Sequence, residues 1–370
     1  MTITKSAAAL FKPFEGGRLT LENRIVMAPM TRQFSPSGIP GPDVAEYYRR
    51  RAANGVGLII TEGTIINHPA AAADQGIPHF YGEEALEGWK RVVNAVHEAG
   101  GKIAPQIWHT GMAREMEKFP DSNAYPVGPS GLNLTGKPVS EPLTIEEIHG
   151  LVQAYAQAAA DAKRIGFDAV EIHGAHGYLI DQFFWEVTNK RTDEYGGDML
   201  GRTRFAVEVI EAVRAAVGPD FPIIFRFSQW KPTNYEAKLA ATPQELERFQ
   251  APLSAAGVDI FHASTRRFWE PEFEGSDLNL AGWMRKLTGK PTITVGSVGL
   301  DSDFISLFQE GKDAGAASID NLIERVERGE FDLVAVGRAL LSDPAWVSKI
   351  RDGRTEELKP FTSEALATLT

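Results

Sequence analysis

The feature that most constrains the fold of this chain is a strict alternation of short apolar runs with amphipathic stretches that end in glycine. The runs are nearly continuous in apolar character, as expected for strands of a parallel sheet buried on both faces. They lie at 24–27, 57–61, 102–108, 169–173, 222–228, 260–264, 292–297 and 333–338. Eight such runs in alternation with helical patterns predict an α/β fold with a parallel sheet.

The stretches between the runs carry helix signals. Residues 151–162 repeat small and apolar side chains at helical spacing. Thr144 opens a capping box, and Thr242 is followed by proline at the first helical position. Each candidate helix ends at a glycine, which adopts a left-handed cap without steric cost. These glycines are Gly55, Gly100, Gly166, Gly218, Gly257, Gly289, Gly329 and Gly353.

The length of the chain leaves the number of domains open. At about 150 residues per domain, 370 residues suggest two or three domains, although α/β barrels often exceed that size as one unit. Two doubly wound domains would need a linker between two complete sets of strands, and no Pro/Gly-rich stretch lies there. We therefore predict a single TIM (β/α)₈ barrel that spans residues 1–370.

Two segments are too long to be simple connections between a strand and a helix. Residues 109–143 follow the third predicted strand, and residues 265–276 follow the sixth. Both lie at strand C-termini, the face where barrel active sites form, so we expect them to cover or line a site. Trp108 and the Phe268–Trp269 pair are candidate pocket walls.

Composition excludes several classes of protein. The net charge is −11, which argues against an electrostatic grip on nucleic acid, and there is no cysteine for a disulfide, an iron–sulfur cluster or a thiolate metal site. No apolar run approaches the roughly 18 residues of a membrane span, and residues 1–14 do not resemble a secretory signal. We expect a cytoplasmic protein without a nucleic-acid or membrane partner. The sequence does not decide between a monomer and a homo-oligomer.

The ends of the last two predicted strands favour binding of an anion. Gly296–Ser297 and Gly337–Arg338 occupy the turns that form the recurrent phosphate site of barrels. Glycine lets the backbone approach a ligand closely, and Arg338 can bind phosphate oxygens in a bidentate fashion. Glycines placed for packing alone are the alternative for either turn.

Gln106 and Arg226, on the third and fifth predicted strands, are expected to point into the barrel mouth. A buried arginine needs an anionic partner, and an amide beside it can hydrogen-bond the edge of a heterocycle. A structural ion pair of Arg226 with Glu62 or Glu171 is the alternative.

His173, His176 and Tyr178 follow the fourth predicted strand and form the most informative stretch. Two imidazole N–H groups can hold an oxygen on which negative charge develops, and a phenol can deliver a proton. Two histidines at this spacing can also ligate zinc, but no third ligand is identified, so we expect no metal. Histidines that cap local carbonyls would be a purely structural alternative.

Taken together, these residues resemble the Old Yellow Enzyme family of FMN-dependent ene-reductases. The resemblance runs from residue 11 to about residue 344. The matching segments are 23–31 (NRIVMAPMT), 106–111 (QIWHTG), 171–179 (EIHGAHGYL) and 189–197 (NKRTDEYGG), the last leading to 202–205 (RTRF).

The resemblance implies an FMN site. The phosphate of FMN would lie on the last two turns beside Arg338. Arg226 would stabilise the N1/O2 region of the flavin, and Thr31 stands where other members place Thr or Cys against flavin O4. The residues implied around the isoalloxazine ring are Ala28, Pro29, Met30, Thr31, Gly63, Gln106 and Arg226.

The resemblance also implies a reaction. NADPH or NADH would reduce the flavin and leave, and an activated alkene would then take the hydride, giving ping-pong kinetics. His173 and His176 would bind the carbonyl or nitro oxygen of the alkene, and Tyr178 would protonate its α-carbon.

The chain departs from the family at its end, where residues 351–370 lack the aromatic, glycine-rich segment that many members lay near the flavin. Edges of the pocket contributed by the tail are therefore not predicted. Two other readings of the sequence remain. A phosphate-binding barrel lyase or isomerase would need a Schiff-base lysine or acid/base carboxylates at the strand ends, and a flavin-binding protein without turnover would not consume NAD(P)H.

Overall fold

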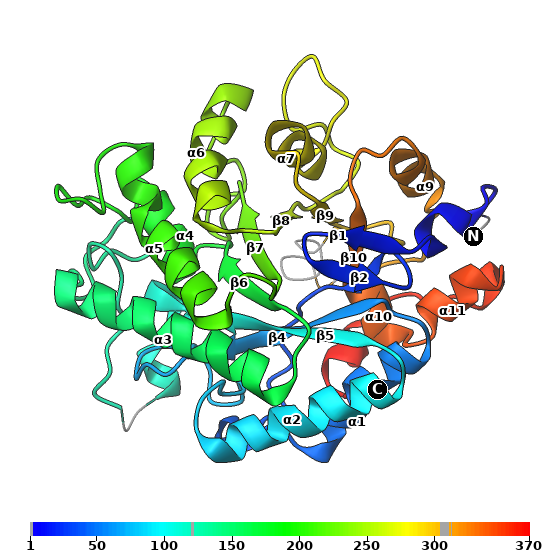
Figure 1. Ribbon diagram of the computed structural model, residues 1–370, viewed down its shortest axis with the longest axis horizontal. Coiled ribbons are helices and arrows are strands. Elements are labelled where there is room, and N and C mark those ends of the chain that lie inside the picture. The colour runs from blue at the N-terminus through cyan, green and yellow to red at the C-terminus, as the bar shows by residue number, and fades with distance from the viewer. Residues whose placement is uncertain (1–2, 120–121, 304–310, 312) are drawn as a thin grey trace.

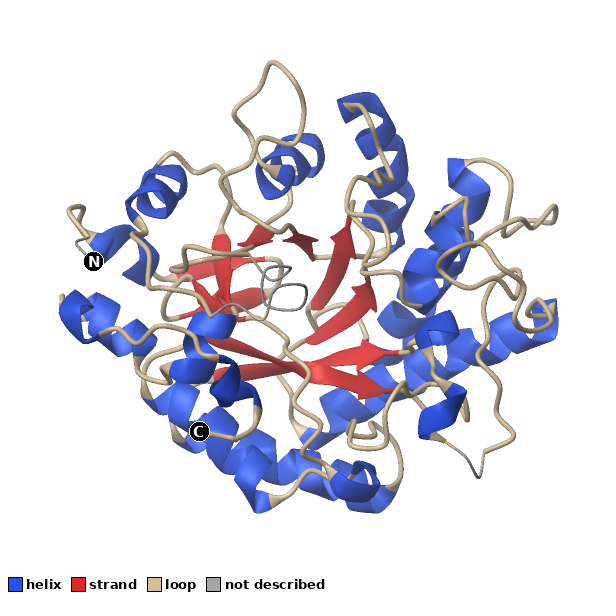
Figure 2. Cartoon of the chain, turned by 180° about the vertical axis from the view of Figure 1, so that it is seen from behind, coloured by secondary structure: helices blue, strands red, loops and turns tan. Residues whose placement is uncertain are grey.

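The computed structural model describes residues 3–119, 122–303, 311 and 313–370. All eight predicted runs form strands, which lie at the centre of the molecule with helices around them (Figures 1 and 2). The strands are β3 (Ile25–Met27), β4 (Leu58–Ile65), β5 (Lys102–Trp108), β6 (Val170–Gly174), β7 (Ile223–Ser228), β8 (Ile260–Ser264), β9 (Thr292–Val295) and β10 (Leu333–Val336).

These strands form a closed barrel in the order β10-β3-β4-β5-β6-β7-β8-β9, and every neighbouring pair is parallel. The predicted TIM barrel is therefore confirmed. The helices are α1 (Pro42–Ala53), α2 (Glu83–Glu98), α3 (Ile145–Ile165), α4 (Leu179–Phe184), α5 (Met199–Val217), α6 (Pro243–Ala256), α7 (Leu280–Thr288), α9 (Asp320–Glu327), α10 (Arg338–Ser342) and α11 (Trp346–Arg351). None of the described helices is long and apolar enough to cross a bilayer.

The helix signals in the sequence agree with the structure. Thr144 caps α3 with both hydrogen bonds of a capping box to Glu147, and Thr242 caps α6 ahead of Pro243. The eight glycines predicted at helix ends all have positive φ angles, from 66° at Gly289 to 125° at Gly257. A residue with a β-carbon would be strained at these positions.

A short antiparallel hairpin, β1 (Phe14–Gly16) and β2 (Leu19–Leu21), was not predicted from the sequence. Phe14, Leu19 and Leu21 pack in one cluster with barrel residues such as Val26 and Ile260. The hairpin therefore closes the end of the barrel at which the strands begin, and it leaves the opposite end for a site.

The two long segments, 109–143 and 265–276, differ in whether they line the cavity at the barrel mouth. Thr265 and Arg266 of the second segment line the cavity described below, whereas Phe268 and Trp269 do not. None of the described residues of 109–143 lines that cavity, and many of them form the wall of a separate surface hollow. The expectation that this first segment lines the site is therefore wrong, and the expectation that it covers the site stays a prediction. The segment contains two short 3₁₀ helices, Gly111–Ala113 and Met116–Lys118.

Candidate active site

A cavity of about 350 Å³ lies at the C-terminal ends of the barrel strands. It collects all the site residues predicted from the sequence except Gly63. Its walls are Ala28, Pro29, Met30, Thr31, Gln106, Trp108, His173, His176, Tyr178, Arg226, Trp230, Pro232, Tyr235, Ser264, Thr265, Arg266, Val295, Gly296, Ser297, Val298, Ala335, Gly337, Arg338, Leu341 and Leu366. Three of these described residues are arginines and none is acidic, although the chain as a whole carries a net charge of −11.

Gly63 lies on β4 beside a register shift in the pairing with β5. A β-carbon at this position would come within 2.3 Å of the Trp108 ring, so the glycine makes room for that ring against the cavity. Its place is behind the wall, and direct contact with a cofactor stays a prediction.

The turn after β6 holds His173, His176 and Tyr178 in a fixed arrangement. His176 has a left-handed backbone (φ 61°), which a non-glycine residue adopts only when its surroundings hold it there. Its backbone N–H donates to Ser228 Oγ at 3.0 Å, and its ring nitrogen Nε2 lies 2.8 Å from Ser264 Oγ. The neighbouring strands β7 and β8 therefore fix this histidine.

Aromatic rings complete the same wall. Trp108 stacks on His173 with a centroid distance of 5.8 Å and meets Tyr178 edge-on at 4.7 Å. Trp230 stacks on His176 at 4.7 Å. His173 Nδ1 accepts the N–H of Ala175 at 3.3 Å, which leaves Nε2 as the ring nitrogen that carries a proton.

Burial sets the protonation states of these three side chains. Desolvation, with a smaller contribution from Arg226, holds the pKa of His173 and of His176 well below the usual value. Desolvation also raises the pKa of Tyr178, against an opposing effect of Arg226. At neutral pH the site therefore presents two neutral imidazoles and a protonated phenol.

Arg226 on β7 and Gln106 on β5 both line the cavity, one on each side of β6. Arg226 is 7% exposed, its NH2 donates to Ser264 Oγ at 3.3 Å, and its buried Nε has no hydrogen-bond partner among the described residues. Gln106 Nε2 donates to Glu171 Oε1 at 2.8 Å. The other oxygen of Glu171 lies 2.6 Å from His262 Nδ1. Burial lowers the pKa of Arg226, and the charge of Glu171 opposes this shift, but no carboxylate among the described residues lies within ion-pair distance of the Arg226 guanidinium. The alternative of a structural ion pair for Arg226 is not supported.

The predicted anion turns come together at the opposite side of the cavity. Gly296 (φ 145°) and Ser297 (φ 51°) turn the chain after β9, and a β-carbon on Gly296 would come within 2.7 Å of the Thr265 carbonyl oxygen. A β-carbon on Gly337 would meet nothing closer than 3.5 Å. Gly337 is therefore not required for packing. Arg338 lines the cavity and donates to the carbonyls of Ser302 and Asp303.

Comparison with known proteins decides the family. The model of the NADH:flavin oxidoreductase / NADH oxidase family matches residues 9–357. The chain belongs to this family. It is 34% identical to 12-oxophytodienoate reductase 7 of Oryza sativa subsp. japonica over 93% of this chain and 88% of the relative. It is 35% identical to the NADH oxidase of Thermoanaerobacter brockii over 96% of this chain and 52% of that protein.

Solved structures agree. Morphinone reductase in complex with tetrahydroNAD is 31% identical, has a TM-score of 0.80, and is matched over 96% of this chain and 93% of its own. The Old Yellow Enzyme homologue from Zymomonas mobilis is 28% identical with a TM-score of 0.78, over 96% of both chains. The predicted Old Yellow Enzyme family, its FMN cofactor and its nicotinamide reductant are confirmed, as is the predicted FMN-dependent oxidoreductase of the ene-reductase type.

The cavity of this Old Yellow Enzyme relative fits FMN. The unpartnered Arg226 Nε and the side chain of Gln106 would be available to a polar ring edge, and the open Gly337 beside Arg338 would leave backbone accessible to a phosphate. No group of three or more His, Asp or Glu side chains that could hold a metal ion occurs among the described residues.

Several residues in the wall of the Old Yellow Enzyme cavity were not predicted as site residues from the sequence. Trp230 and Tyr235 follow β7 in a loop without a periodic pattern, whereas Arg266 follows β8 in the segment 265–276 that was expected to cover or line the site. Leu366 comes from the tail, where no contribution to the pocket was predicted. The Arg32 guanidinium holds this tail through the carbonyls of Ala365, Leu366 and Thr368 at 2.7 to 3.1 Å.

The segment that carries Thr31 is fixed from below by a buried carboxylate. Glu62 Oε2 accepts the backbone N–H of Arg32 at 2.8 Å and that of Gln33 at 3.1 Å. Burial raises the pKa of Glu62 to about 7 in spite of these two hydrogen bonds. The backbone that follows Thr31 in the cavity wall is therefore held by a carboxyl group that titrates near neutral pH.

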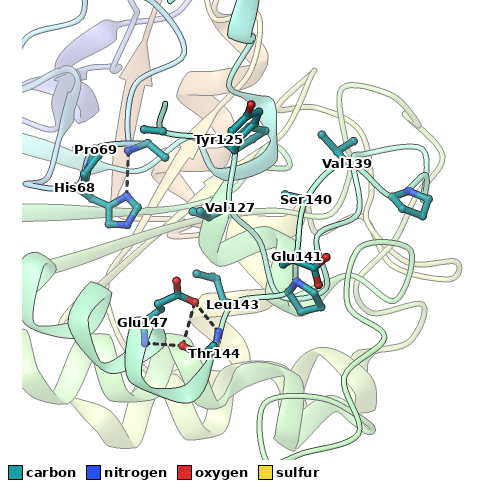
Figure 3. A pocket seen from close by; sticks show the side chains of 15 residues that line it. His68, Pro69, Tyr125, Val127, Val139, Ser140, Glu141, Leu143, Thr144 and Glu147 are labelled. Atoms are coloured by element: carbon teal, nitrogen blue, oxygen red, sulfur yellow. Dashed lines mark hydrogen bonds between the residues drawn. The ribbon is translucent and has the colours of Figure 1, made fainter. Parts of the chain in front are cut away.

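A larger hollow of about 790 Å³ lies on the outside of the barrel, beside the first long segment (Figure 3). Its histidine and the glutamate of the α3 cap are already used in local structure. Glu147 bonds to Thr144 in the cap of α3, and His68 Nδ1 lies 2.9 Å from His109 Nε2 and accepts the N–H of Ala70. The smaller cavity at the barrel mouth is therefore the candidate active site.

Proposed function

We propose that this protein reduces C=C bonds that are activated by a carbonyl or nitro group, and that the residues of the barrel mouth divide the work as their positions suggest. The observation that carries this proposal is the joint placement of two neutral imidazoles and one protonated phenol in a single cavity with the unpaired Arg226. We also propose that residues 1–370 act as one domain.

FMN would be held by Gln106 and Arg226 at its ring and by the turns at Gly296–Ser297 and Gly337–Arg338 at its phosphate. When bound, FMN accepts a hydride from NADH or NADPH and supplies it to the alkene. The fixed positive charge of Arg226 favours negative charge on the neighbouring ring edge. Ala28, Pro29, Met30 and Thr31 would contact the rest of the ring.

His173 and His176 would bind and orient the oxygen of the alkene. The proton on His173 Nε2 is set by the bond that Nδ1 accepts, so this nitrogen is a donor before any ligand arrives. Hydrogen bonds to the oxygen withdraw electron density from the conjugated C=C bond and stabilise the charge that develops on the oxygen. Because the rings are already in place, little reorganisation is needed when the substrate binds.

Tyr178 would donate its proton to the α-carbon. The raised pKa keeps the phenol protonated at neutral pH, and the packing of Trp108 against its edge fixes the direction of the hydroxyl. The alternative of a lyase or isomerase is not favoured, because no lysine, aspartate or glutamate occurs among the described residues of the cavity wall.

We also propose a cytoplasmic enzyme that acts on small molecules without a nucleic-acid or membrane partner. The acidic net charge of −11 and the absence of cysteine support this proposal.

The two half-reactions, followed separately by flavin absorbance under anaerobic conditions, test the proposal. NADH or NADPH should bleach the protein, and 2-cyclohexenone or a nitroalkene should restore the colour within seconds. A saturated ketone of the same size is the matched control and should leave the protein bleached. Reduced protein that no activated alkene reoxidises would contradict the proposed function.

A further inference from the structure

The cavity holds one more cation than the proposed cofactor contacts use. Arg226 is assigned to the flavin ring and Arg338 to its phosphate, whereas Arg266 also lines the cavity and has no assigned role. Arg266 is half-buried at the start of the loop after β8. No carboxylate among the described residues lies within ion-pair distance of its guanidinium.

Arg266 differs in this respect from its neighbour in the chain. Arg267 pairs with Glu270 at 2.9 Å and with Asp303 at 2.8 Å, and it does not line the cavity. Arg266 instead faces a cavity wall that contains no described acid.

Arg266 lies on the same wall of the cavity as His176, which is proposed to bind the oxygen of the alkene. Its guanidinium lies 5.5 Å from the centroid of the Tyr235 ring. Tyr235 lies 5.8 Å from Trp230, and Trp230 stacks on His176 at 4.7 Å. The cation is therefore separated from His176 by two aromatic rings along one continuous wall.

The backbone that carries Arg266 is fixed. The Arg266 carbonyl accepts the hydroxyl of Ser297 at 2.9 Å. On one side, Thr265 Oγ1 donates to the Val295 carbonyl at 2.6 Å, and on the other, the N–H of Phe268 donates to Gly296 O at 3.1 Å. Bonds to β9 and the turn after it therefore fix the backbone from which the Arg266 side chain starts.

We propose that Arg266 binds an anionic group, a carboxylate or phosphate, on a molecule that enters the cavity, at a distance from its reacting end. This inference rests on the proposed function, since the reacting end is placed by His173 and His176. Guanidinium binds both anions with paired hydrogen bonds, and the stacked Tyr235 leaves the guanidinium edge available to them. The anion can belong to the alkene or to the 2′-phosphate of NADPH.

Arg266→Gln, which removes the charge at similar length, and Arg266→Lys, which keeps it, test the proposal. The first arm compares a cyclic enone bearing a carboxyalkyl chain with its methyl ester, with NADH as reductant. The second arm compares the rates of flavin reduction by NADPH and NADH. In one of the two arms the wild type should react faster with the compound that carries the extra anion, which is the free carboxylate in the first arm and NADPH in the second. Arg266→Gln should reduce this rate ratio about tenfold, as expected for loss of a charge-assisted hydrogen bond. Arg266→Lys should retain part of it.

Arg267→Gln is the matched control and should leave both preferences unchanged. The saturated ketone that corresponds to the carboxyalkyl enone binds without turnover, and its dissociation constant can be measured from the flavin spectrum. This dissociation constant should rise in Arg266→Gln if the first arm responds. The preference should also weaken as ionic strength rises. Preferences within about twofold of wild type in both arms overturn the proposal.

Loss of FMN affinity in Arg266→Gln with unchanged preferences also overturns it, because Arg266 would then belong to the cofactor phosphate. Failure of the proposed function looks different. In that case neither the ester nor 2-cyclohexenone reoxidises the reduced wild-type protein, whatever residue occupies position 266.

Discussion

Tyr178 is the residue whose chemistry the geometry defines most sharply. Its phenol faces the cavity beside His173, with ring centroids 5.1 Å apart, and burial keeps it protonated. Tyr178→Phe removes one hydroxyl from a wall that is otherwise held by Trp108. We expect the variant to be reduced by NAD(P)H at nearly the wild-type rate, whereas its reoxidation by 2-cyclohexenone should slow about 100- to 10,000-fold.

Stopped-flow absorbance at the flavin band measures the two rates separately. Trp108→Phe is a useful comparison, because it changes the packing of the same wall without removing an acid, and it should affect the two half-reactions by similar factors. Equal slowing of both half-reactions in Tyr178→Phe would contradict the role of proton donor.

Glu62 predicts a pH dependence of stability. Its pKa rises from 4.5 to about 7 in the folded protein, so the native state binds more protons than the unfolded state between these two values. The free energy of unfolding therefore gains from this group at low pH and loses that gain as pH rises from about 4.5 to about 7. Glu62→Gln should lack this component.

Urea unfolding of both proteins at pH 5 and pH 8 measures it. The stability of the wild type relative to Glu62→Gln should fall between pH 5 and pH 8, by at most about 3 kcal/mol. Identical pH profiles of the two proteins would show that Glu62 does not titrate in this range.

At the scale of elements, the turn after β6 is fixed by a fully buried ion pair. Lys231 Nζ lies 2.8 Å from Asp181 Oδ1, and Asp181 Oδ2 accepts the N–H of Gly177 at 2.7 Å. Both charged side chains are 0% exposed. The pair thus ties the loop after β7 to the start of α4 and to the turn between His176 and Tyr178.

Lys231→Met leaves the buried carboxylate without its partner and should lower the free energy of unfolding by about 3–5 kcal/mol. Lys5→Met, which breaks an exposed pair with Glu324, is the control and should cost less than about 1 kcal/mol. Urea unfolding measures both. The double variant Lys231→Met/Asp181→Leu should recover much of the loss, and a loss in Lys231→Met as small as in Lys5→Met would show that the pair is not stabilising.

The same elements show what the sequence could predict. Strands and their ends were predictable because a buried parallel strand is a continuous apolar run and its last residues fall at the barrel mouth, which located His173, Gln106 and Arg226. Trp230 and Tyr235 were not predictable, since they lie in a loop whose path depends on tertiary contacts, and Arg266 was predicted only as part of the segment 265–276. Local spacing also gave no sign that Gly63 lies behind Trp108 or that the buried Asp181 meets Lys231.

At the scale of the whole molecule, the two ends of the barrel have separate roles. The hairpin β1–β2 closes the end at which the strands begin, and the cavity lies at the other. Phe14 is 3% exposed within this plug. Phe14→Ala should cost about 3–5 kcal/mol of stability while leaving the kinetics of both half-reactions unchanged.

Thermal or urea unfolding together with the half-reaction rates tests this separation. Tyr125→Ala, at a ring that is 64% exposed on the outer surface, is the control and should change neither stability nor rates appreciably. A Phe14→Ala protein of normal stability, or one with normal folding but slowed alkene reduction, would contradict the assignment of the hairpin to stability alone.

The central claim is that the barrel mouth binds FMN, which nicotinamide reduces there. The absorbance spectrum of the purified protein, recorded without oxygen before and after addition of NADPH, tests it most directly. We expect a yellow protein with an oxidised flavin spectrum that bleaches on addition of the reductant. A folded protein that is colourless and takes up no added FMN would contradict the claim.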